Sequence, residues 1–296
     1  MGIAIQPIDG HAFAREVLGA QLWRGLEPVD LERIRGAWAE AGVIVFRRQA
    51  LSEQELVHFS GCLGTPQIVH RRDWISPEHP EVILISNLHD RDGNPIGLAG
   101  TGELGWHTDQ SYLLRPTTGS VLYGVEIPND GGGSTWWANL RLAYAALPAD
   151  LKATIAGKRA VFDYFRRWAT GYEEGARTLT EEMRQQTPPV THALVQVHPV
   201  TGGQSLYFDP WTTTGIVGME PAAARDLLQR LRECTTRPEF TYEHQWQVGD
   251  VVMWDNGFMM HRRGAYNPTQ RRFHKRTTIA LSPERHIVPQ GELLTV

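Results

Sequence analysis

Short apolar segments of strand character recur along this chain, and few segments have the periodicity of a helix. Runs rich in β-branched and aromatic residues, bounded by turn residues, are typical of β-strands. They occur at Val43–Phe46, Val82–Ser86, Val121–Ile127, Ala193–His198, Ser205–Phe208, Phe240–Trp246 and Asp250–Asp255. Helices are expected at Val29–Ala41, Ser52–Leu63, Arg141–Ala156 and Pro221–Cys234. This pattern favours a mainly β fold, a sandwich or barrel core with flanking helices.

Length and composition indicate one large domain with a substantial core. The chain has 296 residues, of which 41% are hydrophobic, so we expect a single domain over residues 1–296. The net charge of -4 comes without a basic tract, which gives no support to nucleic-acid or membrane binding. Two cysteines, no signal-peptide pattern and no apolar run of about 20 residues predict a cytoplasmic protein. The sequence leaves open whether the chain forms a homo-oligomer.

His107 and Asp109 form a His-x-Asp pair that could hold a metal ion. On a β-strand, alternate residues point to the same face, so an imidazole and a carboxylate can converge on one ion. Composition alone predicts roughly one such pair by chance. The chain has a second, His79 and Glu81, which we assign to a solvated loop because Pro80 removes a ladder donor. The pair alone is also compatible with a surface histidine. Residues elsewhere in the chain are needed to distinguish a metal site from that alternative.

A distal histidine and a row of basic residues strengthen the metal hypothesis. His261 follows a short apolar stretch, and a buried neutral imidazole needs a hydrogen bond or a metal. A strand is expected over residues 271–280, with Arg272, His274 and Arg276 on one face. Two arginines at the mouth of a barrel can receive carboxylates through paired hydrogen bonds. A solvated basic edge strand is the alternative.

These motifs resemble those of the taurine dioxygenase (TauD/TfdA-type) family. The likeness rests on His107 and Asp109 within Trp-His-Thr-Asp, and on His261 after Trp-Asp-Asn. It also rests on the arginines that follow, and on the segment 131–139, which is similar to the family's Gly-Gly-Asp-Thr-x-Trp segment. The likeness extends over about residues 5–281, with the elements in the family's order. It implies a double-stranded β-helix (jelly roll) core and iron(II)- and 2-oxoglutarate-dependent oxygenase activity.

The resemblance implies a role for each matched residue. His107, Asp109 and His261 would bind iron(II), and Arg272 and Thr135 would bind the distal carboxylate of the cosubstrate 2-oxoglutarate. The implied reaction consumes O2, releases succinate and CO2, and hydroxylates a small substrate that bears a carboxylate or sulfonate. Desaturation, cyclisation or cleavage of a C–O or C–S bond by the same oxidising chemistry are alternatives. A non-catalytic jelly-roll protein that binds a carboxylate is the alternative of another class.

The resemblance also suggests residues that contact the primary substrate. Arg276 matches a position that often binds a substrate anion. Trp168 and Trp211 match aromatic residues that line the substrate site, and several tryptophans favour a largish, partly apolar substrate. His70 lies near a substrate-contacting histidine of the family, in a register offset by one.

Glu103 departs from the family pattern, because taurine-specific members have an asparagine at this place. A carboxylate so close to the site disfavours taurine, since a second anion needs a cation beside it. We expect Glu103 to pair with an amino group of the substrate, or with Arg276 or Arg115. A solvated loop glutamate is the alternative.

Overall fold

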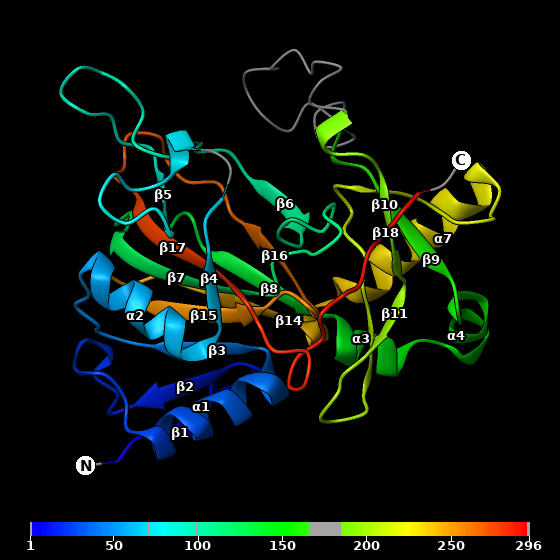
Figure 1. Ribbon diagram of the computed structural model, residues 1–296, viewed down its shortest axis with the longest axis horizontal. Helices are drawn as coiled ribbons and strands as arrows, with labels where there is room; N and C mark the ends of the chain where they lie inside the picture. The colour runs from blue at the N-terminus through cyan, green and yellow to red at the C-terminus, as the bar shows by residue number, and fades with distance from the viewer. Residues whose placement is uncertain (1, 70–71, 99, 166–184, 295–296) are drawn as a thin grey trace.

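The computed structural model describes residues 2–69, 72–98, 100–165 and 185–294 (Figure 1). His70 and Trp168 lie outside the described residues, so their predicted roles have no structural counterpart here. The larger sheet has the strand order β1-β2-β3-β15-β7-β17-β4, and β5 also pairs with β17. Its strands are β1 (Ala4–Pro7), β2 (Arg15–Leu18), β3 (Val43–Phe46), β4 (Thr65–Gln67), β5 (Val82–Ser86), β7 (Gly119–Glu126), β15 (Val251–Asp255) and β17 (Phe273–Ala280).

A smaller sheet has the strand order β14-β8-β16-β6. Its strands are β6 (Leu104–His107), β8 (Thr135–Asn139), β14 (Thr241–His244) and β16 (Met259–Arg263). A buried cluster joins residues of both sheets, such as Trp137 of β8 and Trp254 of β15. The two sheets therefore pack face to face, as the jelly-roll expectation requires.

Strand β3 shows how the sequence builds these layers. All four of its residues are buried. By the alternation of a strand, Val43 and Val45 pack toward the smaller sheet, whereas Ile44 and Phe46 pack toward the helices. Helices α1 (Pro28–Ala41) and α2 (Glu53–Leu63) cover this outer face (Figure 1). A capping box of Ser52 and Glu55 begins α2, as predicted.

A second group of elements lies beside the jelly roll (Figure 1). It contains the sheet β13-β9-β10-β18 and the hairpin β11-β12. Their bounds are β9 (Arg159–Phe162), β10 (Val190–Ala193), β11 (Val195–Val197), β12 (Gln204–Leu206), β13 (Thr213–Ile216) and β18 (Glu292–Leu293). Among the described residues, its helices are α3 (Leu140–Ala146), α4 (Ala149–Ile155) and α7 (Pro221–Thr235). The short 3-10 helices in the same described ranges are Leu22–Arg24, Arg72–Trp74 and Pro238–Phe240.

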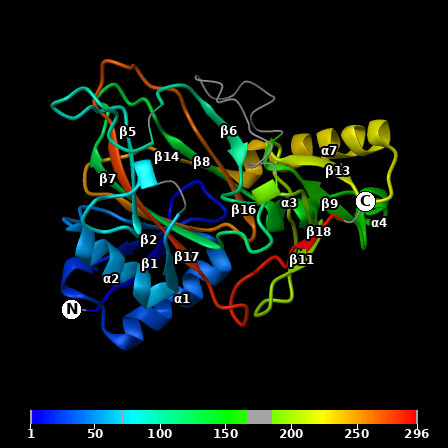
Figure 2. The same cartoon turned by 45° about the horizontal axis from the view of Figure 1, so that its top comes forward.

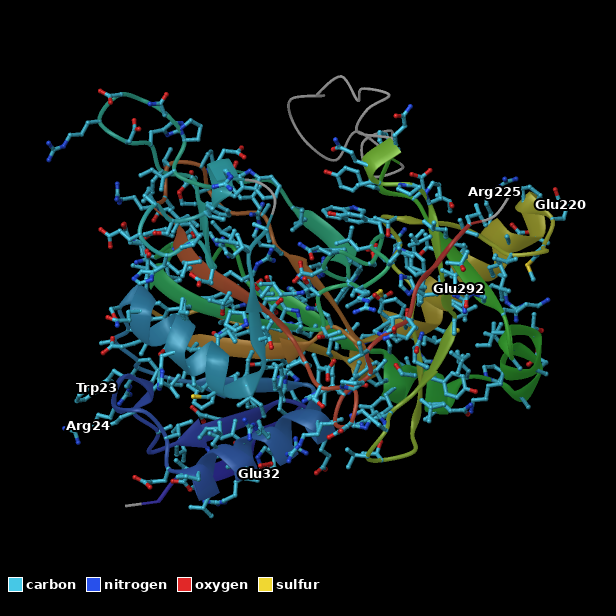
Figure 3. The ribbon with its side chains drawn as sticks, in the orientation of Figure 1. Trp23, Arg24, Glu32, Glu220, Arg225 and Glu292 are labelled. Carbon is cyan, nitrogen blue, oxygen red and sulfur yellow. The ribbon has the colours of Figure 1, made fainter. Side chains whose placement is uncertain are left out.

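Helix α7 shows the expected division between a core face and a solvent face. Leu227 and Leu231 pack into the apolar cluster of this second group. The helix itself lies beside β13 (Figure 2). Glu220 and Arg225 lie at the outward-facing end of the helix (Figure 3). In the described part of the chain, no helix has both the length and the apolar character needed to cross a membrane.

Two predicted elements are wrong in extent. The helix expected over Arg141–Ala156 is two helices, because Pro148 has no N–H to donate and holds Leu147 in an extended conformation. The strand expected over Ala193–His198 is divided between β10 and β11. The other predicted elements occur, with ends displaced by a few residues.

His192 on β10 predicts an acid-sensitive fold. The residue is fully buried, its Nε2 lies 3.0 Å from the carbonyl oxygen of Leu113, and burial lowers its pKa to about 4. An unfolded histidine titrates near 6.5, so the unfolded chain binds the extra proton first as the pH falls. Stability should therefore be full above about pH 6.5 and decrease toward pH 4, by up to about 1.4 kcal/mol per pH unit. Urea unfolding should show a shallower pH dependence in His192→Gln, and an unchanged slope would contradict this assignment.

Candidate active site

The His-x-Asp pair lies at the end of β6. This strand stops at His107, so Asp109 stands in the turn that follows it. The prediction that both residues belong to one strand is therefore wrong, although their side chains do converge. Gln110 has a positive φ of 54°, which turns the chain. Thr108 points elsewhere and donates its hydroxyl to the carbonyl oxygen of Met259 at 3.3 Å.

His261 joins the pair across the smaller sheet. Strand β16 pairs with β6 in a register that sets His261 opposite His107, with 4.1 Å between the ring centroids. Nε2 of His261 lies 3.8 Å from Oδ1 of Asp109. All three residues are buried, and one ligand atom of each lies within 4.8 Å of the others. The structure thus assembles the three residues that the sequence indicated.

The chemistry of these donors fits a divalent metal ion. Nδ1 of His107 lies 2.8 Å from the carbonyl oxygen of Gly105. When Nδ1 donates this bond, Nε2 keeps its lone pair for a metal. Burial lowers the pKa of His107 to about 3 and that of His261 to about 4, so both rings are neutral at pH 7. Two imidazoles and one carboxylate, with other positions free, are the donor set of non-haem iron(II) sites.

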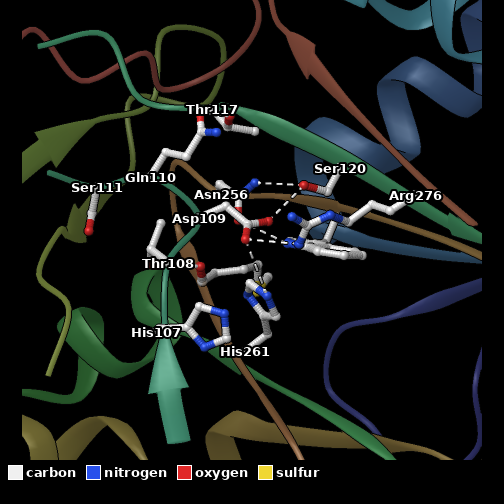
Figure 4. Close-up of polar contacts among 12 residues, drawn as sticks. His107, Thr108, Asp109, Gln110, Ser111, Thr117, Ser120, Asn256, His261 and Arg276 are labelled. Carbon is white, nitrogen blue, oxygen red and sulfur yellow. Dashed lines mark hydrogen bonds and ion pairs between the residues drawn. The ribbon is translucent and has the colours of Figure 1, made fainter. Parts of the chain in front are cut away.

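A chain of side chains orients the Asp109 carboxylate (Figure 4). Ser120 donates to Oδ2 at 2.9 Å, and Asn256 donates to Ser120 at 3.2 Å. Arg276 donates to Oδ1 at 3.0 Å. Burial alone would raise the pKa of Asp109, but Arg276 and the two histidines hold it well below its ordinary value. The sequence analysis missed Ser120, for which no local pattern gives a signal, whereas Asn256 stood in a recognised motif.

Asp209, which the sequence analysis also missed, anchors the turn that carries Asp109. Its Oδ2 accepts from the Ser111 hydroxyl at 2.8 Å, and its Oδ1 accepts from the backbone N–H of Trp211 at 2.6 Å. The Trp211 ring stacks on His107, with 4.7 Å between centroids and 26° between planes. The segment after β12 therefore supports both the turn and one imidazole.

Arg272 is an unusually placed cation. It is 2% exposed, and its Nε and Nη1 have no hydrogen-bond partner among the described residues. Its guanidinium lies over the Tyr266 ring at 5.5 Å. Gly133 passes close by, with a φ of +75°, and a Cβ there would lie 3.0 Å from Nε of Arg272. Burial lowers the pKa of Arg272 to about 9, so the side chain is charged at pH 7. No carboxylate of the described residues forms an ion pair with it.

Thr135 begins β8, two residues after the glycine that passes close to Arg272. Its Oγ1 accepts a hydrogen bond from Nε1 of Trp246 at 2.9 Å. Because the tryptophan N–H can only donate, the threonine hydroxyl keeps its own hydrogen for another acceptor. A short hydroxyl donor and an unpaired guanidinium are the groups expected for a carboxylate receptor.

The shared face of Arg272, His274 and Arg276 is confirmed. His274 is fully buried and Arg276 contacts Asp109 inside the barrel, whereas Lys275 points outward and pairs with Glu53 at 2.9 Å. Strand β17 pairs with β7 on one side and with β5 and β4 on the other. The basic edge-strand alternative is therefore wrong, because β17 lies inside the sheet.

Glu103 has a partner that the sequence analysis did not consider. Its carboxylate pairs with Arg262 at 2.8 Å, and not with Arg276 or Arg115. Arg262 follows His261 on β16, so its side chain points to the opposite face of the strand, where it packs over the Trp136 ring at 4.6 Å. Arg262 thus neutralises the charge of Glu103 at a place outside the set formed by His107, Asp109 and His261.

His79 lies near two acidic residues, and neither of them is Glu81, its partner in the His-x-Glu pair of the sequence. One ligand atom each of Glu53, Glu78 and His79 lies within 4.8 Å of the others. Glu53, however, already receives a hydrogen bond from Ser76 at 2.6 Å and an ion pair from a lysine. This partly exposed cluster is explained by contacts within the chain.

The facing sheets and the buried set of two histidines and one aspartate define a jelly-roll metalloenzyme. The model of the family described as "Taurine catabolism dioxygenase TauD, TfdA family" matches residues 4–278. This chain belongs to that family of iron(II)- and 2-oxoglutarate-dependent dioxygenases.

Individual relatives cover nearly the whole chain. Pentalenolactone F synthase of Streptomyces avermitilis is 31% identical, over 90% of this chain and 91% of its own. The alpha-ketoglutarate-dependent 2,4-dichlorophenoxyacetate dioxygenase of Cupriavidus pinatubonensis is 31% identical, over 94% and 98%. The crystal structure of AAD-2 in complex with Mn(II) and N-oxalylglycine has a TM-score of 0.78 and 30% identity, over 95% and 98%.

Proposed function

We propose that this chain holds iron(II) with His107, Asp109 and His261, and the distal carboxylate of 2-oxoglutarate with Arg272 and Thr135. The observation that carries this proposal is the fully buried guanidinium of Arg272, whose Nε and Nη1 have no hydrogen-bond partner among the described residues. A buried cation without a partner is strongly unfavourable, and a carboxylate fits the fork of a guanidinium with two parallel hydrogen bonds. The structure of AAD-2 in complex with Mn(II) and N-oxalylglycine, a dicarboxylate, supports the binding of a divalent metal and a dicarboxylate in this fold.

The bound iron(II), 2-oxoglutarate and O2 supply the oxidant that hydroxylates a C–H bond, with release of succinate and CO2. The protein prepares the site for this chemistry. Asn256 and Ser120 fix the Asp109 carboxylate, and Trp211 holds the His107 ring. Burial keeps the imidazoles neutral, so they bind metal without first losing a proton.

We propose a small organic acid, a carboxylate or sulfonate, as the primary substrate, with Arg276 and Trp211 in contact with it. Nε of Arg276 is buried without a partner in the described residues, so part of this guanidinium is available to an anion. Relatives named for 2,4-dichlorophenoxyacetate and (S)-phenoxypropionate act on aryloxy carboxylates. We do not propose that Glu103 binds the substrate, because Arg262 neutralises its charge. His70 and Trp168 remain proposals from the sequence.

A substrate screen tests this function. Iron(II)-loaded protein would be incubated with 2-oxoglutarate, O2 and candidate amino acids, sulfonates, aryloxy acids or small natural-product acids, and succinate would be measured. We expect succinate release above the uncoupled background with at least one anionic class, with a hydroxylated product. Tight 2-oxoglutarate binding without O2 consumption for any class would favour the non-catalytic alternative.

We also propose that residues 1–296 form one catalytic domain that works in the cytoplasm. The family match over residues 4–278 supports one domain. Cys62 and Cys234 are both free thiols, which suits a reducing compartment.

A further inference from the structure

His274 is the buried polar side chain of this site that the proposed roles leave unused. It lies between Arg272 and Arg276 on the inner face of β17 and is 0% exposed. Neither Nδ1 nor Nε2 has a hydrogen-bond partner among the described residues. Leaving a buried donor unsatisfied costs about 1–3 kcal/mol, so we expect a partner beyond the described residues, such as a bound ligand.

Trp246 connects His274 to the proposed cosubstrate residues. Its ring packs edge-to-face on the His274 imidazole, with 4.7 Å between centroids and 88° between planes. The same indole donates to Oγ1 of Thr135 at 2.9 Å. Arg272 precedes His274 by two residues on the same face, which is about 6.6 Å along a strand. Thr135 and His274 therefore contact the same indole, and Arg272 lies close enough to His274 for its charge to act on the imidazole.

The His274 ring is a neutral hydrogen-bonding group in a positive environment. Burial, together with the charges of Arg272 and Arg263, holds its pKa well below the ordinary value. A neutral imidazole has one N–H to donate and one lone pair. Next to two guanidinium groups, the ligand that satisfies the N–H most favourably is an anion, because it also neutralises Arg272.

We propose that His274 is a third residue of the cosubstrate receptor and donates a ring N–H to the distal carboxylate of 2-oxoglutarate. The inference rests on the proposed function and adds a residue to it. An ionised carboxylate offers about four lone-pair sites, so it can accept from Arg272, Thr135 and His274 together. His274 is then a specificity residue, which selects a 2-oxoacid with a second carboxylate over one that ends in a methyl group.

Anaerobic binding of two cosubstrates tests this role. Iron(II)-loaded protein would be titrated with 2-oxoglutarate and with 2-oxovalerate, which lacks the distal carboxylate, by following the visible charge-transfer absorption of the bound 2-oxoacid. The variants are His274→Leu, which removes the donor, and His274→Gln, which keeps one. His198→Leu is the matched control, because it removes a fully buried imidazole from the turn after β11.

In His274→Leu, we expect the dissociation constant of 2-oxoglutarate to rise about tenfold or more, as for a lost hydrogen bond to a charged group. The constant for 2-oxovalerate should stay within about twofold, His274→Gln should restore most of the loss, and His198→Leu should bind like wild type. Two results would overturn the proposal. Equal weakening of both oxoacids would show that His274 acts only through the shape of the site, and unchanged 2-oxoglutarate binding would show that it has no role in the receptor. Failure of the wild type to give the absorption would overturn the proposed function itself. If His274→Leu did not fold, the same comparison of both oxoacids in His274→Phe, which keeps a ring but has no N–H donor, would decide, since a purely steric role predicts equal losses.

Discussion

His107→Ala and His261→Ala should each give a folded protein that neither retains iron(II) nor consumes O2 in the presence of substrate. Each histidine supplies one of three donors in a buried set. Loss of a direct ligand should exceed the roughly 10–100-fold effect typical of residues that only orient a ligand. Folding should survive, because both rings are neutral and an alanine leaves no unpaired charge. Iron content after gel filtration, circular dichroism and O2 uptake measure the three expectations.

His79→Ala is the matched control for these variants. It removes a histidine from the other possible metal cluster, in which Glu53 already has partners in the chain. Iron content and turnover should equal those of the wild type. Near-normal turnover in His107→Ala or His261→Ala, or loss of iron in His79→Ala, would remove the proposed triad from consideration.

Arg272→Leu should abolish tight 2-oxoglutarate binding without harming the fold. Loss of one side of a buried charge pair costs roughly 2–5 kcal/mol, which is about 30-fold or more in the dissociation constant. In the absence of ligand the same change removes a buried charge that has no ion-pair partner among the described residues. Thermal stability without 2-oxoglutarate should therefore be equal or higher, while stabilisation by added 2-oxoglutarate should disappear.

Arg276→Leu is the contrasting variant, because we assign this arginine to the primary substrate. It should weaken the primary substrate and, at equal iron content, leave the binding of 2-oxoglutarate comparatively intact, because Ser120 still holds the Asp109 carboxylate when the contact from Arg276 is lost. Separate anaerobic titrations of the two variants would distinguish the arginines. If Arg276→Leu lost the 2-oxoglutarate complex while Arg272→Leu kept it, the two roles would be exchanged.

Local sequence signals predicted much of the fold. The capping box at Ser52 and the alternation in β17 depend on residues close together in the chain, so the pattern alone was informative. The prediction of one helix over Arg141–Ala156 was wrong at Pro148. A proline inside a helical pattern is itself a local signal that the helix ends, and the prediction did not use it.

The candidate site was predictable only in part. The metal-type donors and the arginines could be recognised, because their residue types and order carry the resemblance. The position of Asp109 in a turn could not, since it depends on the distant Asp209 anchor. The pairing of Glu103 with Arg262 likewise depends on β6 and β16 lying side by side. Such contacts are set by tertiary structure and leave no local pattern.

The most direct test of this account is anaerobic addition of 2-oxoglutarate to the iron(II)-loaded wild type and to Asp109→Ala. In the wild type, the account predicts a visible charge-transfer absorption that saturates when one equivalent of 2-oxoglutarate has been added per iron. In Asp109→Ala it predicts no such absorption. Wild-type protein that holds iron(II) but gives no absorption with 2-oxoglutarate would contradict the proposed site, as would an undiminished absorption in Asp109→Ala.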